Sequence, residues 1–231
     1  MLFGGTVGDD DDFESAVIEM IALSGKAAPA FLFIGFAQLE PHHGYEYYGE
    51  LFKKRGCPCD LLTNEDIAGG KASGKIAAAD VIFIMGGNTE KLVDTLEKNG
   101  LSKDLREAAG RGAVMSGFSA GAICLCRAGM SKNEDYYMQE GIGCLDLLFC
   151  PHPKTSERRY RAFLCEMEER PGETGAAFDG AGLEIADGRY RAFVFGKDHM
   201  ANLCRSDGAG CAEKPVSSDW RPASELRSIG R

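Results

Sequence analysis

The sequence predicts an α/β fold in which a mostly parallel β-sheet is sandwiched between helices, with an antiparallel edge near the C-terminus. Two observations lead to this prediction. In the first half of the chain, short apolar runs alternate with stretches of helical spacing, which is typical of a parallel sheet covered by helices on both faces. Later in the chain, short strand-like runs are separated by turn residues, which favours antiparallel pairing.

Five apolar runs are the expected strands of the main sheet. Val81–Ile84 is the clearest, because it is short, rich in β-branched residues and soon followed by glycines. Phe31–Ile34, which comes soon after Pro29, has the same buried character. The other expected strands are Cys57–Leu62, Ala113–Met115 and Leu147–Cys150.

Helices are expected between and after these strands. Thr89–Asn99 places Leu92, Val93 and Leu96 on one face and is followed by Gly100, a typical residue beyond a helix end. The other segments with helical spacing are Tyr45–Lys54, Leu101–Arg111 and Ser156–Arg170.

The C-terminal third is expected to form the antiparallel edge. Its strand candidates are Leu183–Ala186, Ala192–Phe195 and Met200–Cys204, and an Asp-Gly turn at residues 187–188 separates the first two. The polar segment from residue 211 to residue 231 contains two prolines and is expected to be a loosely docked tail. No repeat or linker divides the chain, so residues 1–231 are expected to form a single domain.

Composition excludes several classes of protein. The chain has 231 residues, a 44% apolar content and a formal net charge of −9, which are values of a globular domain large enough to bury a core. The acidic balance argues against nucleic-acid binding, which needs clustered lysine and arginine. No apolar run approaches the roughly 18 residues of a membrane span, and no secretory signal is recognised at the N-terminus.

The nine cysteines and one acidic run have simple interpretations. The odd number of cysteines, several of them in apolar runs, favours a reduced, cytoplasmic protein without structural metal, since the C-x-C pairs lack spaced partner pairs. Asp9–Asp12 lacks the spaced oxygen ligands of a calcium loop. We therefore expect Asp12 to cap a helix that starts near Phe13.

The clearest catalytic signal is the run Gly117–Gly121, which reads Gly-Phe-Ser-Ala-Gly and matches the G-x-S-x-G pattern. It follows an expected strand and precedes a helix-like run, Ala120–Cys126, which is the context that a nucleophile elbow requires. The glycines allow a tight turn and close backbone approach. Ser119 is therefore the candidate nucleophile, although this pattern also arises by chance in glycine-rich chains.

A nucleophilic serine needs a base, and the chain has four histidines. His152 directly follows the expected strand Leu147–Cys150, and active-site groups gather at the carboxyl ends of parallel strands. His199 is a second candidate in an expected hairpin. His42 and His43 are expected to be solvated on the surface.

A second glycine signal follows the strand Val81–Ile84. Gly86 and Gly87 can present backbone N–H groups to an oxyanion, which would complete the site around Ser119. The alternative is an ordinary strand-to-helix turn in which Asn88 caps the next helix.

Together these motifs resemble the peptidase E and cyanophycinase group of serine peptidases. The stretches that carry the resemblance are residues 81–89, 117–122 and 150–152, and their order fits that group over about residues 30–205. The resemblance implies a flavodoxin-like, three-layer fold similar to class I glutamine amidotransferases. It also implies hydrolysis of small peptides by a Ser-His-acid triad, with a preference for an N-terminal aspartate in peptidase E itself.

Roles are carried over from that resemblance residue by residue. Ser119 is the expected nucleophile and His152 the expected general base, and the N–H groups of Gly87 and Ala120 are the expected oxyanion hole. The acid is expected at Glu134, or at Asp135 if the loop is shifted by one position.

Two further residues are expected to bind substrate, Asn88 and Arg158. A planar guanidinium suits the carboxylate of a substrate aspartate, although an Arg-Arg-Tyr-Arg run on a helix is usually a solvated face. The first glycine that is frequent in the family is here Met85, and Pro153 stands where an aromatic residue is frequent.

Two other functions remain open at this point. A small α/β-hydrolase esterase would combine Ser119 with His199 and with Asp179 or Asp187 as the acid. A catalytically idle relative would bind small ligands or partners instead. For the peptidase we expect a small peptide substrate, no metal or other cofactor, no nucleic-acid or membrane partner, and a monomer or homodimer.

Overall fold

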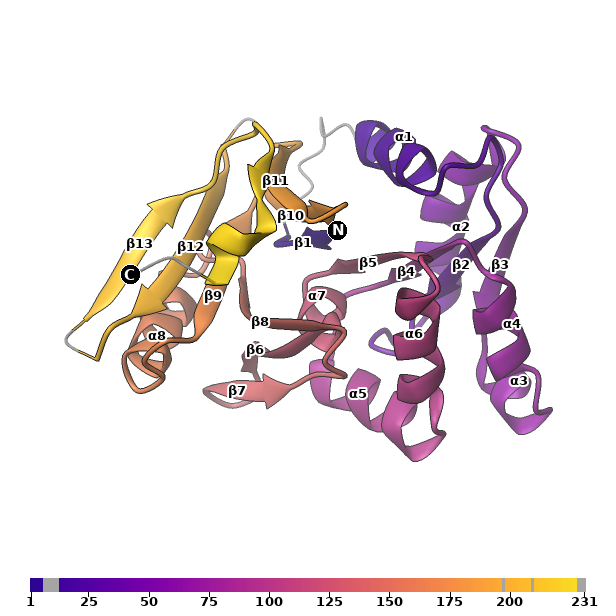
Figure 1. Cartoon of the computed structure of the whole chain (residues 1–231). Helices are drawn as coiled ribbons and strands as arrows, with labels where there is room; N and C mark the ends of the chain where they lie inside the picture. Colours follow the sequence, from indigo (N-terminus) through magenta and orange to yellow (C-terminus); the bar gives the residue numbers. More distant parts are fainter. Residues whose placement is uncertain (6–12, 197, 209, 228–231) are drawn as a thin grey trace.

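The computed structural model describes residues 1–5, 13–196, 198–208 and 210–227, and within them the chain forms two β-sheets with flanking helices (Figure 1). The first sheet has the strand order β14 (Arg221–Pro222), β11 (Arg189–Val194), β10 (Ala181–Ala186), β1 (Leu2–Phe3), β5 (Val114–Phe118), β4 (Val81–Ile84), β2 (Phe31–Ile34) and β3 (Cys59–Leu62). The second has the order β13 (Cys211–Pro215), β12 (Met200–Ser206), β9 (Thr174–Asp179), β8 (Leu145–Pro151), β6 (Cys126–Lys132) and β7 (Tyr136–Glu140).

The helices pack against these sheets on several faces. They are α1 (Phe13–Leu23), α2 (Pro41–Lys53), α3 (Asn64–Ala68), α4 (Ala72–Ala78), α5 (Thr89–Lys98), α6 (Leu101–Gly110), α7 (Ala120–Leu125), α8 (Glu157–Glu168) and the short 3-10 helix η1 (Ala223–Arg227). Buried side chains of α1 and α2 share one apolar cluster, whereas those of α4 to α7 belong to another. Helix α8 contributes to a third cluster, with strands of the second sheet.

The parallel core explains why the apolar runs form strands. Strands β1, β5, β4, β2 and β3 pair in parallel, and β2 alternates its side chains between two apolar clusters. Phe31 and Phe33 face the cluster of α1 and α2, while Leu32 and Ile34 face that of α4 to α7. Burial on both faces accounts for the continuous apolar sequence, and the α/β prediction is confirmed.

The antiparallel edge is confirmed in part. Strands β10 and β11 form a hairpin, and Asp187 and Gly188 at its turn have φ values of 49° and 70°, as a type I′ turn requires. Strand β12, however, does not extend this edge. It pairs with β9 and β13 in the second sheet, which the apolar pattern alone did not separate from the first.

The expectation of a loosely docked tail is wrong for residues 211–227. Strand β13 pairs with β12, β14 pairs with β11, and Leu226 is buried. Strand β13 lies at a sheet edge with four of its five residues exposed, so its polar sequence reflects an edge strand and not an undocked segment. The last four residues, like Asp9–Asp12, lie outside the described residues.

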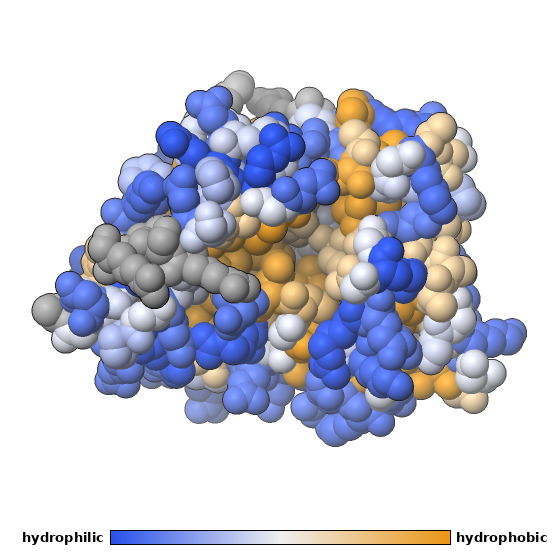
Figure 2. Space-filling model, in the orientation of Figure 1, coloured by the Kyte–Doolittle hydropathy of each residue, from blue (hydrophilic) through white to orange (hydrophobic). Residues whose placement is uncertain are grey.

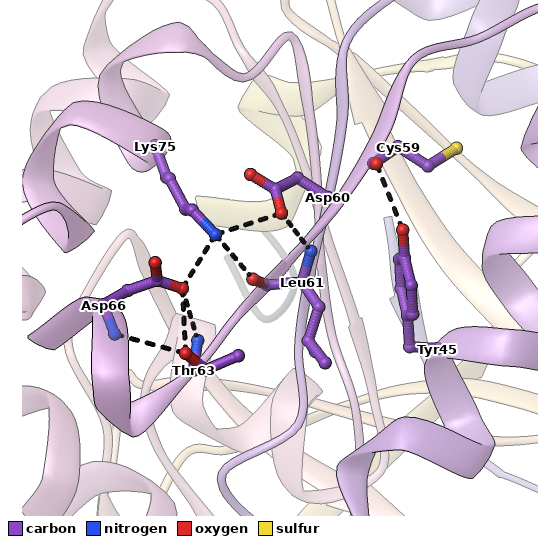
Figure 3. Close-up of polar contacts among 7 residues, drawn as sticks. All are labelled: Tyr45, Cys59, Asp60, Leu61, Thr63, Asp66 and Lys75. Carbon is purple, nitrogen blue, oxygen red and sulfur yellow. Dashed lines mark hydrogen bonds and ion pairs between the residues drawn. The ribbon is translucent and has the colours of Figure 1, made fainter.

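A charged cluster joins the edge strand β3 to helices α3 and α4 (Figure 3). The Nζ atom of Lys75 donates to Oδ1 of Asp60 at 3.0 Å, to Oδ2 of Asp66 at 2.7 Å and to the carbonyl of Leu61 at 3.0 Å. Asp66 and Thr63 also form a reciprocal capping box at the start of α3. Burial alone would raise the pKa of Asp66, but the hydrogen bonds from Lys75 and Thr63 hold it below its usual value.

The junction of the two sheets is apolar and hollowed (Figure 2). A cavity of about 420 Å³ lies beside the start of β5 and the end of β10, and Met115, Leu145 and Ile185 are among its lining residues. The apolar core nevertheless continues from one sheet to the other, because one cluster includes Ile82 of the first sheet and Phe149 of the second. All nine cysteines are free thiols. Within the described ranges, no helix is long and apolar enough to cross a bilayer.

Candidate active site

Ser119 lies on a sharp turn between β5 and α7. Its φ of 52° and ψ of −109° are unfavourable for a residue with a side chain, as expected of a nucleophile elbow. The flanking glycines make this turn possible. A Cβ atom on Gly121 would lie 1.9 Å from the carbonyl oxygen of Ile84, and one on Gly117 would lie 2.4 Å from the carbonyl oxygen of Gly121. The predicted reason for both glycines is therefore confirmed.

The structure brings His152 to Ser119. Oγ of Ser119 lies 2.9 Å from Nε2 of His152, which is within hydrogen-bond distance. His152 follows β8, and its φ of 56° marks a second strained turn. Two segments 33 residues apart thus place a hydroxyl and an imidazole in contact at the ends of neighbouring sheets.

The segment Phe3–Gly5, at the end of β1, holds both turns in place. The N–H of Ser119 donates to the carbonyl of Phe3 at 2.9 Å, and the N–H of His152 donates to the carbonyl of Gly4 at 2.8 Å. Gly5 has a φ of 114°, and a Cβ atom there would lie 1.9 Å from the ring of His152. The absence of a side chain at Gly5 is therefore needed for the contact.

The predicted oxyanion donors belong to the elbow and to the loop that packs on it. Ala120 is the first residue of α7, so its N–H has no acceptor within the helix. A Cβ atom on Gly86 would lie 3.0 Å from Cβ of Ser119, which shows how closely this loop packs on the elbow. Gly87 has a φ of 142°, and a Cβ there would lie 2.4 Å from the carbonyl oxygen of Ala37. The loop thus requires glycine, and Gly87 is exposed.

Asn88 has the capping role that the sequence offered as an alternative. Its side chain accepts a hydrogen bond from the N–H of Lys91 at 2.8 Å and so caps α5. The side-chain oxygen is therefore already engaged, and Asn88 is exposed.

The structure does not bring Glu134 or Asp135 to His152. Both acids are exposed in the turn between β6 and β7, and neither hydrogen-bonds to His152 or is among the charges that shift its pKa. Among the described residues, Glu134 makes no side-chain hydrogen bond or ion pair. The reason is topological: β6 and β7 form an antiparallel hairpin whose polar turn projects into solvent.

Asp179 is the carboxylate that acts on His152. It is buried at the end of β9, and its Oδ2 accepts hydrogen bonds from the N–H of Lys154 at 3.2 Å and from the N–H and hydroxyl of Thr155 at 2.9 and 3.0 Å. These bonds fix the turn that carries His152. Its charge also raises the pKa of His152.

The pKa of His152 is nevertheless below its ordinary value. Burial is the largest cause, because it disfavours the imidazolium, and the positive charge of Arg159 lowers the pKa further. The opposing effect of Asp179 is smaller than these two together. At neutral pH the imidazole is therefore largely neutral, as a general base must be.

Arg159, and not Arg158, is directed towards this region. Arg158 is exposed and makes no hydrogen bond or ion pair with the described residues. Arg159 is half-buried, its Nη1 donates to the carbonyl of Pro151 at 3.3 Å, and its guanidinium carbon lies 5.7 Å from the ring centroid of Tyr136. The helical register of α8 decides this difference between adjacent arginines.

The other candidate pairing is not formed. His199 is exposed before β12, and the hydrogen bond of Ser119 goes to His152. Asp187 lies in the β10–β11 turn beside the 420 Å³ cavity, at the amino end of β5 and not at the elbow. Within the described parts of the chain, no group of three or more His, Cys, Asp or Glu side chains could hold a metal ion.

Sequence reasoning did not assign four residues that contribute to the site, namely Gly4, Gly5, Asp179 and Arg159. Gly4 and Gly5 were an available signal, since two consecutive glycines directly after a strand often mark close backbone approach. Asp179 ends a strand and precedes a glycine, as site residues often do, but the sequence offered it only for the esterase. The helical spacing was a signal for Arg159, because it lies four residues before Phe163, a buried residue of α8, and Arg158 does not.

Comparison with known proteins gives one family. The family model described as "Peptidase family S51" matches residues 1–192. The curated "Uncharacterized peptidase YgaJ" of Bacillus subtilis (strain 168) is 37% identical over 108 residues, which are 46% of this chain and 47% of that protein. The match thus spans about half the length of this relative.

Two solved structures share the fold. The crystal structure of a peptidase from an acI-B1 Actinobacterium has a TM-score of 0.68 and 17% identity, and the match covers 96% of this chain and 95% of the other. A "Putative Peptidase E Protein" from Listeria monocytogenes EGD-e has a TM-score of 0.54 and 19% identity, with 94% and 97% of the two chains covered.

Proposed function

This chain belongs to peptidase family S51. We propose that it is a serine peptidase that hydrolyses small peptides through an acyl-enzyme on Ser119. The observation that carries the proposal is the 2.9 Å contact between Oγ of Ser119 and Nε2 of His152 on a strained elbow. A serine hydroxyl is a weak nucleophile unless a base accepts its proton, and this contact supplies the base.

In the proposed reaction, Oγ of Ser119 attacks the scissile carbonyl carbon while Nε2 of His152 accepts the hydroxyl proton. The oxyanion that forms is bound by the N–H groups of Gly87 and Ala120. His152 then donates its proton to the leaving amine, and the C–N bond breaks to give an ester on Ser119. Water, deprotonated by His152, hydrolyses that ester and restores the serine.

We propose Asp179, in place of Glu134, as the acid that supports His152. The support is its effect on the pKa of His152 and its three hydrogen bonds to the turn at residues 154–155. A carboxylate in this role orients the imidazole and stabilises the imidazolium formed during the reaction. Asp179 is a positioning residue in this proposal, because it acts through His152 and its turn.

Dipeptides with an N-terminal aspartate are the first substrates to assay. Cationic side chains lie around Tyr136 on the His152 side of the site: Lys132 and Arg159 each lie 5.7 Å from its ring centroid. The assay compares Asp-X with Ala-X and Glu-X peptides.

The decisive experiment replaces the two contacting residues. Ser119→Ala and His152→Ala should each reduce kcat on dipeptides by about 10⁴-fold or more, since loss of either group disables the nucleophile. His199→Ala is the matched control and should leave kcat unchanged. A fluorophosphonate should label Ser119 in the wild-type protein and should not label the Ser119→Ala variant.

The outcomes separate the three candidate functions. Full activity of Ser119→Ala would falsify the proposal. Loss of activity in His199→Ala, with His152→Ala still active, would favour the esterase arrangement. A folded wild-type protein that neither reacts with fluorophosphonate nor hydrolyses peptides would be the idle binding relative.

A further inference from the structure

We propose that Arg159 forms a carboxylate-binding subsite on the leaving-group side of His152, which holds the free C-terminal carboxylate of a dipeptide. This inference rests on the proposed function and deepens it, because it makes the enzyme selective for substrates whose leaving residue ends in a carboxylate. It concerns the α-carboxylate of the leaving residue and not the side chain of the residue before the cut.

The first argument is an uncompensated charge. Arg159 is half-buried, its Nε is buried without a hydrogen-bond acceptor, and among the described residues it forms no ion pair. Three other half-buried arginines each pair with glutamate, namely Arg55 with Glu14, Arg170 with Glu166 and Arg191 with both Glu19 and Glu184. A partly buried guanidinium without a carboxylate is costly, so its partner is expected to arrive with the ligand.

The second argument is the set of donors around Arg159. The hydroxyl of Tyr136 and Oγ of Ser156 lie 2.8 Å apart, and either can be the donor, so this pair can turn a hydroxyl towards an anion. Lys132 lies over the same Tyr136 ring at 5.7 Å and, in the described part of the chain, has no carboxylate partner. Two cations without a carboxylate partner among the described residues thus lie beside one tyrosine ring, in a protein of net charge −9.

Nearby acids do not neutralise Arg159. Glu157, on the same helix, is held by Arg161 at 2.5 Å. Glu134 and Asp135 are exposed in the turn before Tyr136, and neither pairs with Arg159. Asp179 bonds to the turn after His152, as described above, and acts on His152 with the opposite sign to Arg159.

The third argument is that Arg159 lies on the side of the site where the leaving residue is expected to bind. In the proposed reaction His152 donates a proton to the leaving amine, so the leaving residue lies against the imidazole. In a dipeptide the α-carboxylate is only two bonds from that nitrogen. Arg159 is close enough to His152 to influence its pKa and is anchored to Pro151, the residue before it. A guanidinium in this position suits the carboxylate of the leaving residue, which it can bind with two parallel hydrogen bonds.

The experiment compares each dipeptide with its own C-terminal amide. The pairs are Asp-Leu with Asp-Leu amide and Ala-Leu with Ala-Leu amide, so that any preference at the first residue cancels within a pair. Wild-type kcat/KM should favour the free acid by about 10- to 100-fold, which corresponds to the loss of a charge-assisted hydrogen bond. Arg159→Gln should reduce this ratio to about 1 by slowing the acid and not the amide.

Two variants guard against a purely structural effect. Arg161→Gln, on the same helix but paired with Glu157, should keep the wild-type ratio. Arg159→Lys keeps the charge and loses the planar fork, so it should give an intermediate ratio. Folding of Arg159→Gln is judged by thermal unfolding and by fluorophosphonate labelling of Ser119. If this variant does not fold, the acid-to-amide ratio of kcat/KM in Arg159→Lys is used for the test.

Each result has one meaning. A wild-type enzyme that hydrolyses acid and amide equally, or a folded Arg159→Gln variant with the full wild-type ratio, overturns the inference while the peptidase proposal stands. Collapse of the ratio in Arg158→Gln, with Arg159→Gln unaffected, also overturns it. A wild-type enzyme that hydrolyses none of the four peptides counts against the proposed function itself and removes the basis of the inference.

Discussion

Lys75 and Arg159 are two partly buried cations in very different surroundings. Lys75 donates to two carboxylates and a carbonyl, and the acids around it belong to neighbouring elements of the first sheet region (Figure 3). Arg159 donates to one carbonyl and pairs with no acid among the described residues. Both side chains extend from a helix towards a strand or strand end, so the backbone setting is similar and the difference lies in the charges around them.

This difference separates structure from function within one chain. A cation whose partners are all built in holds elements together and has little left to offer a ligand. A cation beside a reactive histidine, without its counter-ion, costs stability and so indicates a site that a ligand completes. The following substitutions test this contrast, beginning with the largest expected effect.

Among the substitutions that test this contrast, Asp179→Asn should have the largest effect on activity, a fall in kcat/KM of about 10²- to 10⁴-fold. It also removes a charge that raises the pKa of His152, so the acid limb of the pH profile should move to lower pH. Arg159→Gln removes a charge that lowers this pKa, and its acid limb should move to higher pH. Measurement of kcat/KM against pH for both variants tests the opposite signs.

Glu134→Gln is the comparison for Asp179→Asn. If Glu134→Gln causes the greater loss and the greater shift of the acid limb, the acid is the one expected from the sequence resemblance. If Asp179→Asn has the same kcat/KM as the wild type and the same pH dependence, Asp179 has no part in orienting His152.

Gly5→Ala should reduce kcat by about 100-fold, because the new methyl group would displace the ring of His152 from Ser119. Gly25→Ala is the matched control, since Gly25 also has a positive φ, of 67°, but has open space around it. Both variants should lose about 1 kcal/mol of stability from backbone strain. If both variants keep full activity, close packing of the His152 ring against Gly5 is not required for catalysis.

Lys75→Met should have the smallest effect and should change stability only. We expect a loss of about 1 kcal/mol in the free energy of unfolding, since the ion pairs are partly solvated, with unchanged kcat/KM. The pKa of Asp66 is lowered in the folded protein, so this stabilisation is present at neutral pH and is lost as Asp66 is protonated in acid. Denaturant unfolding should be measured at pH 7 and below pH 4. The difference in the free energy of unfolding between the variant and the wild type should be smaller in acid.

The sequence predicted the parallel part of the fold well, for local reasons. Val81–Ile84 and Phe31–Ile34 form strands with the expected bounds, because burial on both faces leaves a continuous apolar run. Neighbouring residues encode the turn at Ser119 and the helix after it. They also encode the capping role of Asn88. His152 could be matched to Ser119 through its motif and its place after a strand.

The second sheet and the charges of the site could not be predicted in the same way. Strand β12 was assigned to the wrong edge, because its pairing with the distant strand β9 leaves no local pattern, and β6 and β7 were missed although they form a local hairpin. Asp179 comes to His152 only through the parallel pairing of β8 with β9. The missing partner of Arg159 is a property of its three-dimensional neighbours, which residue order alone does not define.

The contact between Ser119 and His152 depends on a strand that is distant from both in sequence. The carbonyls of Phe3 and Gly4 anchor the two turns, and the N–H of Gly180, next to Asp179, donates to the carbonyl of Gly5 at 3.0 Å. A refolding chain can therefore build its helices and most of both sheets and still be inert. Hydrolysis should begin only when β1 inserts between β5 and β10. The rate at which activity returns during refolding should therefore report the rate at which this short strand pairs with its neighbours.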